Sequence, residues 1–166
     1  MKRKTVGELL IKFHHVGMVV RNVDQAVGFF QGLGIGPFES SKLIHINRRM
    51  YGKPVPGDVR VIVKTTTIGP IGIELIQPVT GKSTPQEWLE SHGEGISHLA
   101  FVVDDIEEAK STMVEEGFNI IYSSDNEGGG GMAFFSTSEV GGIIIELEEL
   151  PPHLDKDAYW GNKPWD

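Results

Sequence analysis

Two histidines and two glutamates recur at matching places in the two halves of the chain, and all four side chains are of types that bind metal ions. His15 and His98 each stand at the head of an apolar run, at an offset of 98 − 15 = 83 in the numbering. Glu74 and Glu146 each lie inside another apolar run, at an offset of 146 − 74 = 72. A carboxylate is rarely buried without a partner or a metal, because an isolated buried charge costs several kcal/mol. The doubled pattern therefore predicts one shared, inward-facing metal site.

The donor set leaves the identity of the metal open. Two imidazoles and two carboxylates suit divalent Zn, Co, Ni, Mn or Fe. The chain contains no cysteine, so thiolate sites and disulfides are excluded. Taken alone, each histidine would more often be a hydrogen-bonded core residue and each glutamate a solvent-facing one, since a strand alternates its faces. The repetition of both at equivalent places favours ligation.

The elements that must position these residues repeat as well. After each histidine strand, Asn22 and Asp105 predict helix N-caps, because such side chains accept the backbone N–H groups of the first turn. Each helix is predicted to end at a glycine, Gly34 and Gly117, and the offset between these glycines is the same as that between the two histidines. Each half therefore predicts the order strand, helix, strand, strand, strand.

Short runs rich in β-branched residues supply the strands. The expected strands are residues 11–20, 42–46, 59–67 and 73–76 in the first half, and 96–103, 119–123, 132–136 and 143–147 in the second. The glycine-rich stretch 125–131 is not a P-loop, because it lacks the Gly-Lys-Ser/Thr ending before a helix. It is either a mobile loop over a site or a plain hairpin connection.

Two segments lie outside the repeat. Residues 81–94 link the halves, and Thr84–Glu87 predicts a capping box with a proline at the first helical position and Trp88 as a core anchor. The tail, 151–166, is proline-rich and polar but carries three aromatic residues, Tyr159, Trp160 and Trp165. These aromatics favour docking on the chain's own body or on a partner subunit over disorder.

The remaining histidines have no counterpart in the other half. His14 is expected on the opposite face of its strand from His15, since side chains alternate along a strand. His45, His92 and His153 are expected in turns or in the tail. We therefore assign these four histidines ordinary structural roles.

The bulk properties exclude several classes of function. A chain of 166 residues with 39% hydrophobic residues and a net charge of −8 can bury a core but lacks the basic footprint of nucleic-acid or membrane-surface binding. No apolar run approaches the roughly 18–20 residues of a membrane span. The N-terminus has no apolar signal-peptide core. We expect a soluble, cytoplasmic protein that acts on a small molecule.

Four segments resemble the vicinal oxygen chelate superfamily, which includes glyoxalases, bleomycin resistance proteins and dioxygenases. They are His15–Gly17, Ile73–Pro78, Gly95–Phe101 and Gly142–Leu147. The resemblance implies an α+β fold in which tandem βαβββ modules form a curved mixed sheet around a divalent metal. The first module would be 11–80, the linker helix 81–94 and the second module 95–150, followed by the tail, 151–166, in one glyoxalase-like domain.

The resemblance also implies the ligands and the chemistry. In that family the ligands would be His15, Glu74, His98 and Glu146, as the repeat had already suggested. A divalent metal that binds two neighbouring substrate oxygens stabilises an enolate, and a nearby carboxylate moves the proton on the adjacent carbon. Glu146 is the best candidate for that base. Many members dimerise, so the resemblance allows a homodimer.

Within the superfamily the chain looks most like methylmalonyl-CoA epimerase, an isomerase. The segment 42–64 is rich in basic residues, and its Arg48, Arg49, Arg60 and Lys64 are candidates for binding the phosphates of an acyl-CoA substrate. An ordinary solvated hairpin is the alternative. Such epimerases carry a second catalytic glutamate just before the strand that starts here at Val59. This chain has Asp58 there, as a displaced substitute at best, which puts a two-base epimerase in doubt.

Other members of the superfamily remain as alternatives. The second ligand of the epimerases is often glutamine, whereas Glu74 is typical of a glyoxalase I-like lactoylglutathione lyase. An Fe(II) dioxygenase generally uses two histidines and one carboxylate, so a second carboxylate argues against it. A non-catalytic binding protein of the resistance type often loses its ligands. The metal, the substrate and the oligomeric state stay open at this level.

Overall fold

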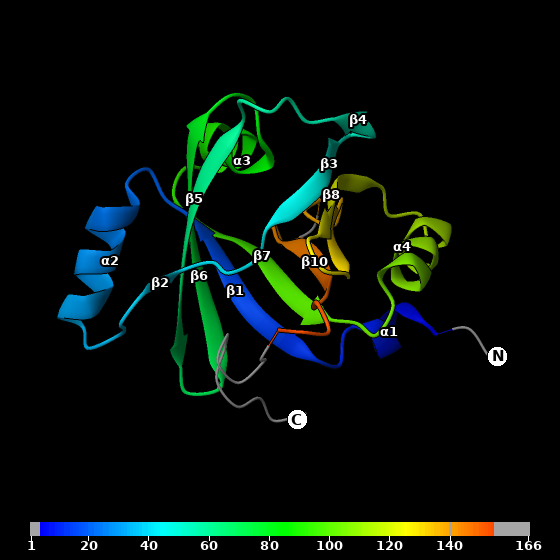
Figure 1. Ribbon diagram of the computed structural model, residues 1–166, viewed down its shortest axis with the longest axis horizontal. Helices are drawn as coiled ribbons and strands as arrows, with labels where there is room; N and C mark the ends of the chain where they lie inside the picture. The colour runs from blue at the N-terminus through cyan, green and yellow to red at the C-terminus, as the bar shows by residue number, and fades with distance from the viewer. Residues whose placement is uncertain (1–3, 140, 155–166) are drawn as a thin grey trace. The chain divides into compact units, whose positions relative to one another are not determined.

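The computed structural model describes residues 4–139 and 141–154 of the chain and has the predicted mixed α+β fold (Figure 1). The helices are α1 (Val6–Leu9), α2 (Val23–Gly32), α3 (Thr84–His92) and α4 (Ile106–Glu115). The strands are β1 (Phe13–Val19), β2 (Glu39–Ser40), β3 (His45–Met50), β4 (Lys53–Pro54), β5 (Arg60–Ile68), β6 (Ile71–Thr80), β7 (Gly95–Val102), β8 (Ile120–Asn126), β9 (Gly131–Phe135) and β10 (Ile144–Glu149).

The described residues form two compact units, each assembled from separate pieces of the chain. Unit 1 contains the described residues of Met1–His14, Leu43–Val55 and His98–Leu154. The described residues of unit 2 are His15–Lys42 and Pro56–Ser97. Each unit has its own sheet with a helix on one face, and each is described separately below.

In unit 2 the strands follow the order β2, β5, β6, β1. β1 runs parallel to β6, and β5 runs antiparallel to β6. Helix α2 lies along β5 and β6 (Figure 1), where Val20, Val23 and Leu75 form a buried core. As predicted, the Asn22 side chain caps α2 and accepts the N–H of Gln25 at 2.9 Å. The first module's strand, helix and closing parallel strand thus follow the sequence pattern.

Helix α3 belongs to unit 2 and differs from the prediction in its cap. The N-cap is Ser83, whose hydroxyl accepts the N–H of Gln86, so the assignment of the cap to Thr84 was wrong by one residue. Both residues are hydroxyl-bearing, and the sequence alone does not choose between them. Trp88 is buried, as predicted. His92 is the last residue of α3 and stacks on Trp88 at 3.9 Å, so its expected place in a turn was wrong.

In unit 1 the strands follow the order β7, β10, β9, β8, β3, β4. β10 is parallel to β7, and the other neighbours are antiparallel. Helix α4 packs on one face, where Ala109, Met113, Ala133, Phe135 and Leu147 form the centre of a core with hardly any exposed surface. Asp105 caps α4 by accepting the N–H of Glu108 at 2.9 Å, as predicted.

The β3–β4 hairpin pairs with β8 of unit 1 rather than with β5. The strand predicted at 42–46 begins three residues later and extends to Met50. His45 therefore starts a strand, and its expected place in a turn was wrong. Tyr51 and Gly52, both with positive φ, form the two-residue turn that closes the hairpin. The sequence analysis placed this segment in the first half of the repeat. Strand pairing depends on distant residues, so the local pattern could not reveal that β3 pairs with β8.

The glycine-rich stretch connects β8 to β9 as a tight hairpin. Gly130 has a φ of 74°, and a Cβ there would collide with the carbonyl oxygen of Glu149. Gly131 has no room for a Cβ either, which would lie 2.7 Å from the carbonyl oxygen of Ser124. The plain hairpin connection is therefore the alternative that the structure supports, and the glycines serve close backbone packing.

The chain begins with a short helix that the strand and helix pattern did not predict. Helix α1 has a capping box, in which Thr5 accepts the N–H of Glu8 and the Glu8 carboxylate accepts the N–H of Thr5. Leu9 is buried against the α4 side of unit 1. Lys4 and Lys12 both donate to the Asp104 carboxylate, at 3.1 and 2.7 Å.

We expect the Asp104 ion pairs to stabilise the fold fully above about pH 4 and progressively less as the pH falls toward 2. Hydrogen bonds from Lys12 and then from Lys4 lower the pKa of Asp104 from 3.8 to about 2. A carboxyl whose pKa is lower in the folded chain stabilises it above the unfolded pKa and loses that effect as the pH falls toward 2. Because the Asp104 side chain is 64% exposed, Asp104→Asn should cost less than about 1 kcal/mol at pH 6. Urea unfolding at pH 6 and pH 3 measures this, and an equal cost at both would contradict it.

Two remaining predictions concern the tail and membranes. Residues 155–166, which include Tyr159, Trp160 and Trp165, lie outside the described residues, so their expected docking stays a prediction. None of the described helices is both long enough and apolar enough to cross a bilayer.

Candidate metal centre

Unit 2 brings His15 and Glu74 together on one face of its sheet. In the parallel β1–β6 pair, His15 lies opposite Gly72 and Gly17 lies opposite Glu74. The His15 and Glu74 side chains therefore project from the face that α2 does not cover. His15 Nε2 is 3.6 Å from Glu74 Oε2, and the two side chains are 2% and 14% exposed.

Unit 1 brings His98 and Glu146 together in the same manner. In the parallel β7–β10 pair, His98 lies opposite Ile144 and Ala100 lies opposite Glu146. The two side chains project from the face opposite to α4. His98 Nε2 is 3.0 Å from Glu146 Oε2, and the side chains are 2% and 6% exposed.

The two pairs have the same strand register. In each unit the glutamate lies two residues beyond the residue that faces the histidine, on a strand parallel to the histidine strand. The repeat seen in the sequence therefore corresponds to a repeat in local geometry. Each pair offers an imidazole nitrogen and a carboxylate oxygen from side chains that are buried or, for Glu74, partly buried, and these are donors that hold a metal ion. The residues present thus fit a divalent metal.

A third buried pair lies in unit 1. His14 Nδ1 is 3.3 Å from Glu148 Oε2, and both side chains are 2% exposed. An ordinary buried role for His14 was predicted, but Glu148 was not singled out from the sequence. The available signal was its spacing, since Glu148 lies two residues after Glu146 and so on the same face of β10.

Tyr122 on β8 was also missed. Across the sheet of unit 1, Glu146 faces Phe134, and Phe134 in turn faces Tyr122. The Phe134 ring lies between its neighbours, 5.0 Å from the His98 ring and 5.8 Å from the Tyr122 ring, measured between centroids. Nothing in the sequence alone distinguishes this tyrosine, because its role depends on which strands pair.

Burial and three neighbouring groups shift the pKa of the Tyr122 phenol. Burial raises its pKa, the positive charge of Arg48 and a hydrogen bond with Ser124 lower it, and the charge of Glu146 raises it, with a net upward shift. The phenol therefore stays protonated at neutral pH and its hydroxyl remains a hydrogen-bond donor. The same causes place Arg48 and Glu146 within electrostatic reach of Tyr122.

The basic residues predicted to bind substrate differ in their surroundings. Arg48 is half-buried, whereas Arg49 is exposed and its guanidinium donates to the Gly52 carbonyl in the hairpin turn at 3.2 Å. Lys64 donates to Ser40 at 3.0 Å and shares the face of Leu75, on the α2 side of its sheet. Arg60 is exposed, and its Nε lies 3.5 Å from the Thr80 hydroxyl. Their role in substrate binding stays a proposal.

Asp58 lies apart from the His15–Glu74 pair. Its carbonyl oxygen accepts the Thr80 hydroxyl at 2.5 Å, at the far end of the β5–β6 hairpin. Thr80 is six residues from Glu74 along β6 (80 − 74), which is about 20 Å in a strand. Asp58 is therefore far from Glu74 along the sheet of unit 2, and its predicted role as a displaced second base stays a prediction.

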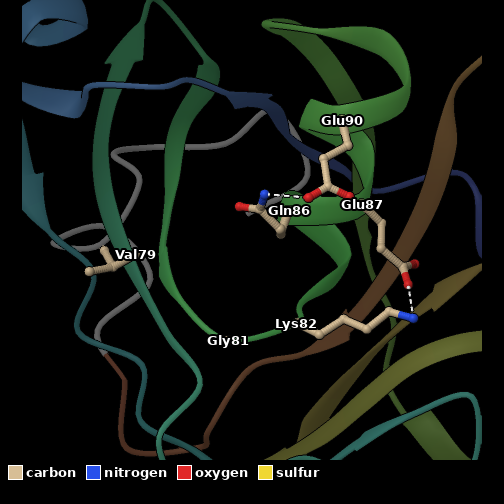
Figure 2. A pocket seen from close by; sticks show the side chains of 6 residues that line it. All are labelled: Val79, Gly81, Lys82, Gln86, Glu87 and Glu90. Atoms are coloured by element: carbon tan, nitrogen blue, oxygen red, sulfur yellow. Dashed lines mark hydrogen bonds and ion pairs between the residues drawn. The ribbon is translucent and has the colours of Figure 1, made fainter.

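A separate cavity of about 440 Å³ opens in unit 2 where β6 leads into α3. Figure 2 shows Lys82 extending toward Glu87 and Gln86 toward Glu90, in an ion pair of 3.2 Å and a hydrogen bond of 2.7 Å. Its lining contains none of the residues predicted to act in the site. These polar groups satisfy one another, so the cavity adds nothing to the metal-binding chemistry.

Comparison with known proteins identifies relatives over most of the chain. A family model described as the Glyoxalase/Bleomycin resistance protein/Dioxygenase superfamily matches residues 14–135. The Bacillus subtilis (strain 168) protein YqjC is 26% identical over 141 residues, which cover 83% of this chain and 91% of YqjC. The mitochondrial methylmalonyl-CoA epimerase of Dictyostelium discoideum is 25% identical over 153 residues, which cover 87% of this chain and 82% of that enzyme.

Solved structures share the fold. The crystal structure of hypothetical protein BH1468 from Bacillus halodurans C-125 matches with a TM-score of 0.62 and 25% identity, covering 87% of this chain and 97% of that one. A Streptomyces coelicolor methylmalonyl-CoA epimerase variant in complex with 2-nitronate-propionyl-CoA matches with a TM-score of 0.60 and 21% identity, covering 84% and 97%. At such identities the structural match shows the fold alone.

Proposed function

Because the chain belongs to the Glyoxalase/Bleomycin resistance protein/Dioxygenase superfamily, we propose that it is a divalent-metal-dependent isomerase or epimerase that moves a proton next to a carbonyl or thioester. The observation that carries this proposal is the His–Glu pair that recurs in both units with the same register. Core packing alone does not explain four ionisable side chains at repeated positions, of which three are buried and Glu74 is partly buried.

His15, Glu74, His98 and Glu146 would hold one metal ion, each pair supplying a nitrogen and an oxygen ligand. When bound, a divalent ion supplies Lewis-acid stabilisation of negative charge on two neighbouring substrate oxygens. The buried surroundings strengthen that effect, because little water competes for the charge. The donor set is compatible with Zn, Co, Ni, Mn or Fe.

Glu146 is the proposed base. Its carboxylate takes the proton from the carbon next to the carbonyl, and it returns the proton to the same carbon in an epimerisation or to the neighbouring carbon in an isomerisation. The His98 ring beside it fixes the carboxylate's position. Since Asp58 lies at the far end of its hairpin, the simplest scheme returns the proton from Glu146 itself or from solvent.

An acyl-CoA such as methylmalonyl-CoA is the proposed substrate. The Dictyostelium discoideum relative is a methylmalonyl-CoA epimerase and aligns with 87% of this chain. Incubation of methylmalonyl-CoA with metal-loaded protein in deuterium oxide should introduce one deuterium per acyl group, detectable by mass spectrometry. Absence of exchange from protein that carries a full complement of metal would contradict the proposal. The homodimer and the cytoplasmic location expected from the sequence stay predictions.

Glu74 favours a second candidate, a glyoxalase I-like lyase. A carboxylate at this ligand position is typical of glyoxalases, whereas the related epimerases often have glutamine. The lyase would form lactoylglutathione from methylglyoxal and glutathione. The absorbance of this product measures the reaction and distinguishes it from thioester epimerisation. Activity in this assay without deuterium exchange into methylmalonyl-CoA would favour the lyase.

We expect the purified protein to bind about one divalent metal ion per chain. His98→Ala removes a ligand nitrogen and should weaken metal binding by more than about 100-fold, since loss of groups that merely support ligands already costs 10–100-fold. Elemental analysis and calorimetric titration measure this. His92→Ala is the matched control, because His92 lies exposed at the end of α3. Equal metal content in both variants would contradict the assignment.

A further inference from the structure

We propose that Tyr122 is the proton donor that acts on the opposite side of the substrate from Glu146, and that Ser124 and His45 connect its hydroxyl to solvent. This role rests on the function proposed above and extends it, because the scheme given there contains a single acid–base group. All four residues belong to unit 1.

Direct inversion of a carbon next to a carbonyl requires a proton donor across from the base. A base on one side returns the proton to the side from which it came, unless the planar intermediate turns over in the site. A second group on the other side delivers a proton there without such a movement. The donor must therefore face Glu146 across the width of one small acyl group.

Strand register places Tyr122 across the sheet from Glu146 and on the same face. Glu146 faces Phe134 and Phe134 faces Tyr122, on the face opposite to α4. Adjacent strands lie about 4.8 Å apart, so the Cα atoms of Glu146 and Tyr122 are about 10 Å apart. The buried Phe134 ring lies between them, 5.8 Å from the Tyr122 ring. An acyl group resting on this ring would have the carboxylate on one side and the phenol on the other.

The surroundings of the Tyr122 phenol suit a proton donor. Burial is the largest cause that raises its pKa, the net shift is upward, and the hydroxyl therefore carries its proton at neutral pH. The positive charge of Arg48 and the hydrogen bond with Ser124 act in the other direction. Both stabilise the phenolate that remains after the proton has left, so the anion formed during turnover has partners.

Ser124 connects the phenol to the surface. It lies two residues after Tyr122 on β8, so the two side chains share one face. The Ser124 hydroxyl is buried, it hydrogen-bonds the phenol, and its Oγ lies 3.1 Å from Nδ1 of His45. His45 is exposed at the start of β3, and histidine both takes up and releases protons near neutral pH. The three side chains therefore link the site to water.

A bulge at Asn47 in β3 turns His45 toward Ser124. Two residues of β3 stand there opposite Ser124 alone, between the pairs that Ile46 forms with Asp125 and Arg49 with Ser123. Asn47 has a φ of 50°, and its amide donates to the Asp125 carboxylate at 2.7 Å. Without the extra residue, the alternation of side chains along β3 would place His45 on the opposite face of the sheet.

The proposed cycle exchanges one substrate proton for one solvent proton. Glu146 takes the proton from the carbon next to the carbonyl, and the electron pair of the C–H bond moves toward the carbonyl oxygen as an enolate. The enolate carbon then takes the Tyr122 proton, and the carbonyl forms again. The phenolate takes the Ser124 hydroxyl proton, which Nδ1–H of His45 replaces, and the other His45 nitrogen takes a proton from water. Release of the Glu146 proton and exchange at His45 restore the first state.

The test separates proton exchange from inversion. One epimer of methylmalonyl-CoA is incubated with metal-loaded protein in deuterium oxide, and the amount and deuterium content of each epimer are then measured against a blank without protein. Wild-type protein should form the other epimer with one deuterium. Tyr122→Phe keeps the ring but lacks the proton, so conversion should fall by about 10²–10⁴-fold. Glu146 should still exchange deuterium into the unconverted epimer, at a rate within about threefold of proton abstraction by wild type.

His45→Ala tests the connection to solvent. Loss of the imidazole should slow conversion by about 3- to 10-fold, because the buried Ser124 hydroxyl then recovers its proton more slowly. Imidazole added to the buffer should restore the rate, since His45 lies at an exposed position. A merely structural effect of the substitution would not respond to imidazole. An unchanged rate, or a loss that imidazole does not restore, would overturn the connection through His45.

Tyr51→Phe is the matched control, because it also removes one phenol hydroxyl from unit 1. Tyr51 is 55% exposed in the turn of the β3–β4 hairpin, and this variant should convert the epimer at the wild-type rate. Urea unfolding of each variant verifies that it folds. If Tyr122→Phe keeps its conversion rate, or loses exchange and conversion in equal proportion, Tyr122 is not the donor.

Failure of the donor and failure of the proposed function give different results. Wild-type protein with a full complement of metal that neither exchanges nor converts methylmalonyl-CoA would overturn the proposed reaction, and the donor with it. Wild-type protein that exchanges deuterium into the starting epimer without converting it would support proton abstraction and overturn the donor.

Discussion

Glu146→Gln should lower the rate of deuterium exchange into methylmalonyl-CoA by at least about 10²–10⁴-fold. A positioned general base contributes a factor of this size, and an amide cannot accept the proton at neutral pH. Loss of one carboxylate ligand would also weaken metal binding. The exchange rate is therefore measured at a saturating metal concentration, and the metal content of the protein is determined in parallel. The Gln side chain keeps the shape of Glu, and the fold should persist.

Glu149→Gln tests whether the effect belongs to Glu146 or to any acid on β10. Glu149 lies three residues later, and its Oε2 accepts the N–H of Ile106 at the start of α4, at 2.9 Å. An amide oxygen can accept the same hydrogen bond, so the exchange rate should stay within about twofold of wild type. If Glu149→Gln lowers the rate as much as Glu146→Gln does, the assignment of the base is wrong.

Phe135→Ala should lower the free energy of unfolding by about 3–5 kcal/mol. Phe135 has no exposed surface and lies in the unit 1 core between the sheet and α4. Truncation removes the transfer free energy of the ring and leaves a cavity that the surrounding side chains fill only in part. Urea unfolding followed by circular dichroism measures the change, with the slope m checked for a two-state transition.

Val114→Ala provides the comparison. Val114 lies on the same helix but is 50% exposed, and alanine is the better helix former, so the two effects nearly cancel. Its effect should stay within about 0.5 kcal/mol of wild type. A loss below about 1 kcal/mol for Phe135→Ala would mean that the core tolerates the cavity and that stability resides elsewhere.

The parts of the fold that depend on local pattern were predicted well from the sequence. Asn22 and Asp105 cap their helices as expected, because capping is decided by a few neighbouring residues. Helix α1 was not predicted, although Thr5 and Glu8 have the spacing of a capping box in the sequence.

The parts that depend on pairing between distant strands could not be predicted. The β3 segment was assigned to the first half of the repeat from its position in the chain, but β3 pairs with β8. The bulge at Asn47 determines which arginine shares a face with Tyr122. Neither fact has a local signature, since register is decided by burial in the folded sheet. The same reason explains why Tyr122 was missed, whereas Glu148 was missed although its spacing from Glu146 placed it on the same face of β10.

The candidate site lies between these cases. His15, Glu74, His98 and Glu146 could be proposed from the sequence because the duplication repeats each of them. The structure adds the local register that places each glutamate beside its histidine. The duplication offers no such help for Arg48, Arg49, Arg60 and Lys64, which have no repeat partners. Their surroundings were available only from the structure.

The pairing of β3 with β8 also bears on how the protein is made. Met50 pairs with Tyr122, which follows it by almost half the length of the chain. At about 5–20 residues per second, a ribosome needs on the order of 4–14 s to synthesise that interval. An isolated two-stranded hairpin is only marginally stable in water, so the β3–β4 hairpin remains unpaired until β8 has been synthesised. Synonymous slow codons between Met50 and Tyr122 would lengthen that wait, and the yield of folded protein should respond to them.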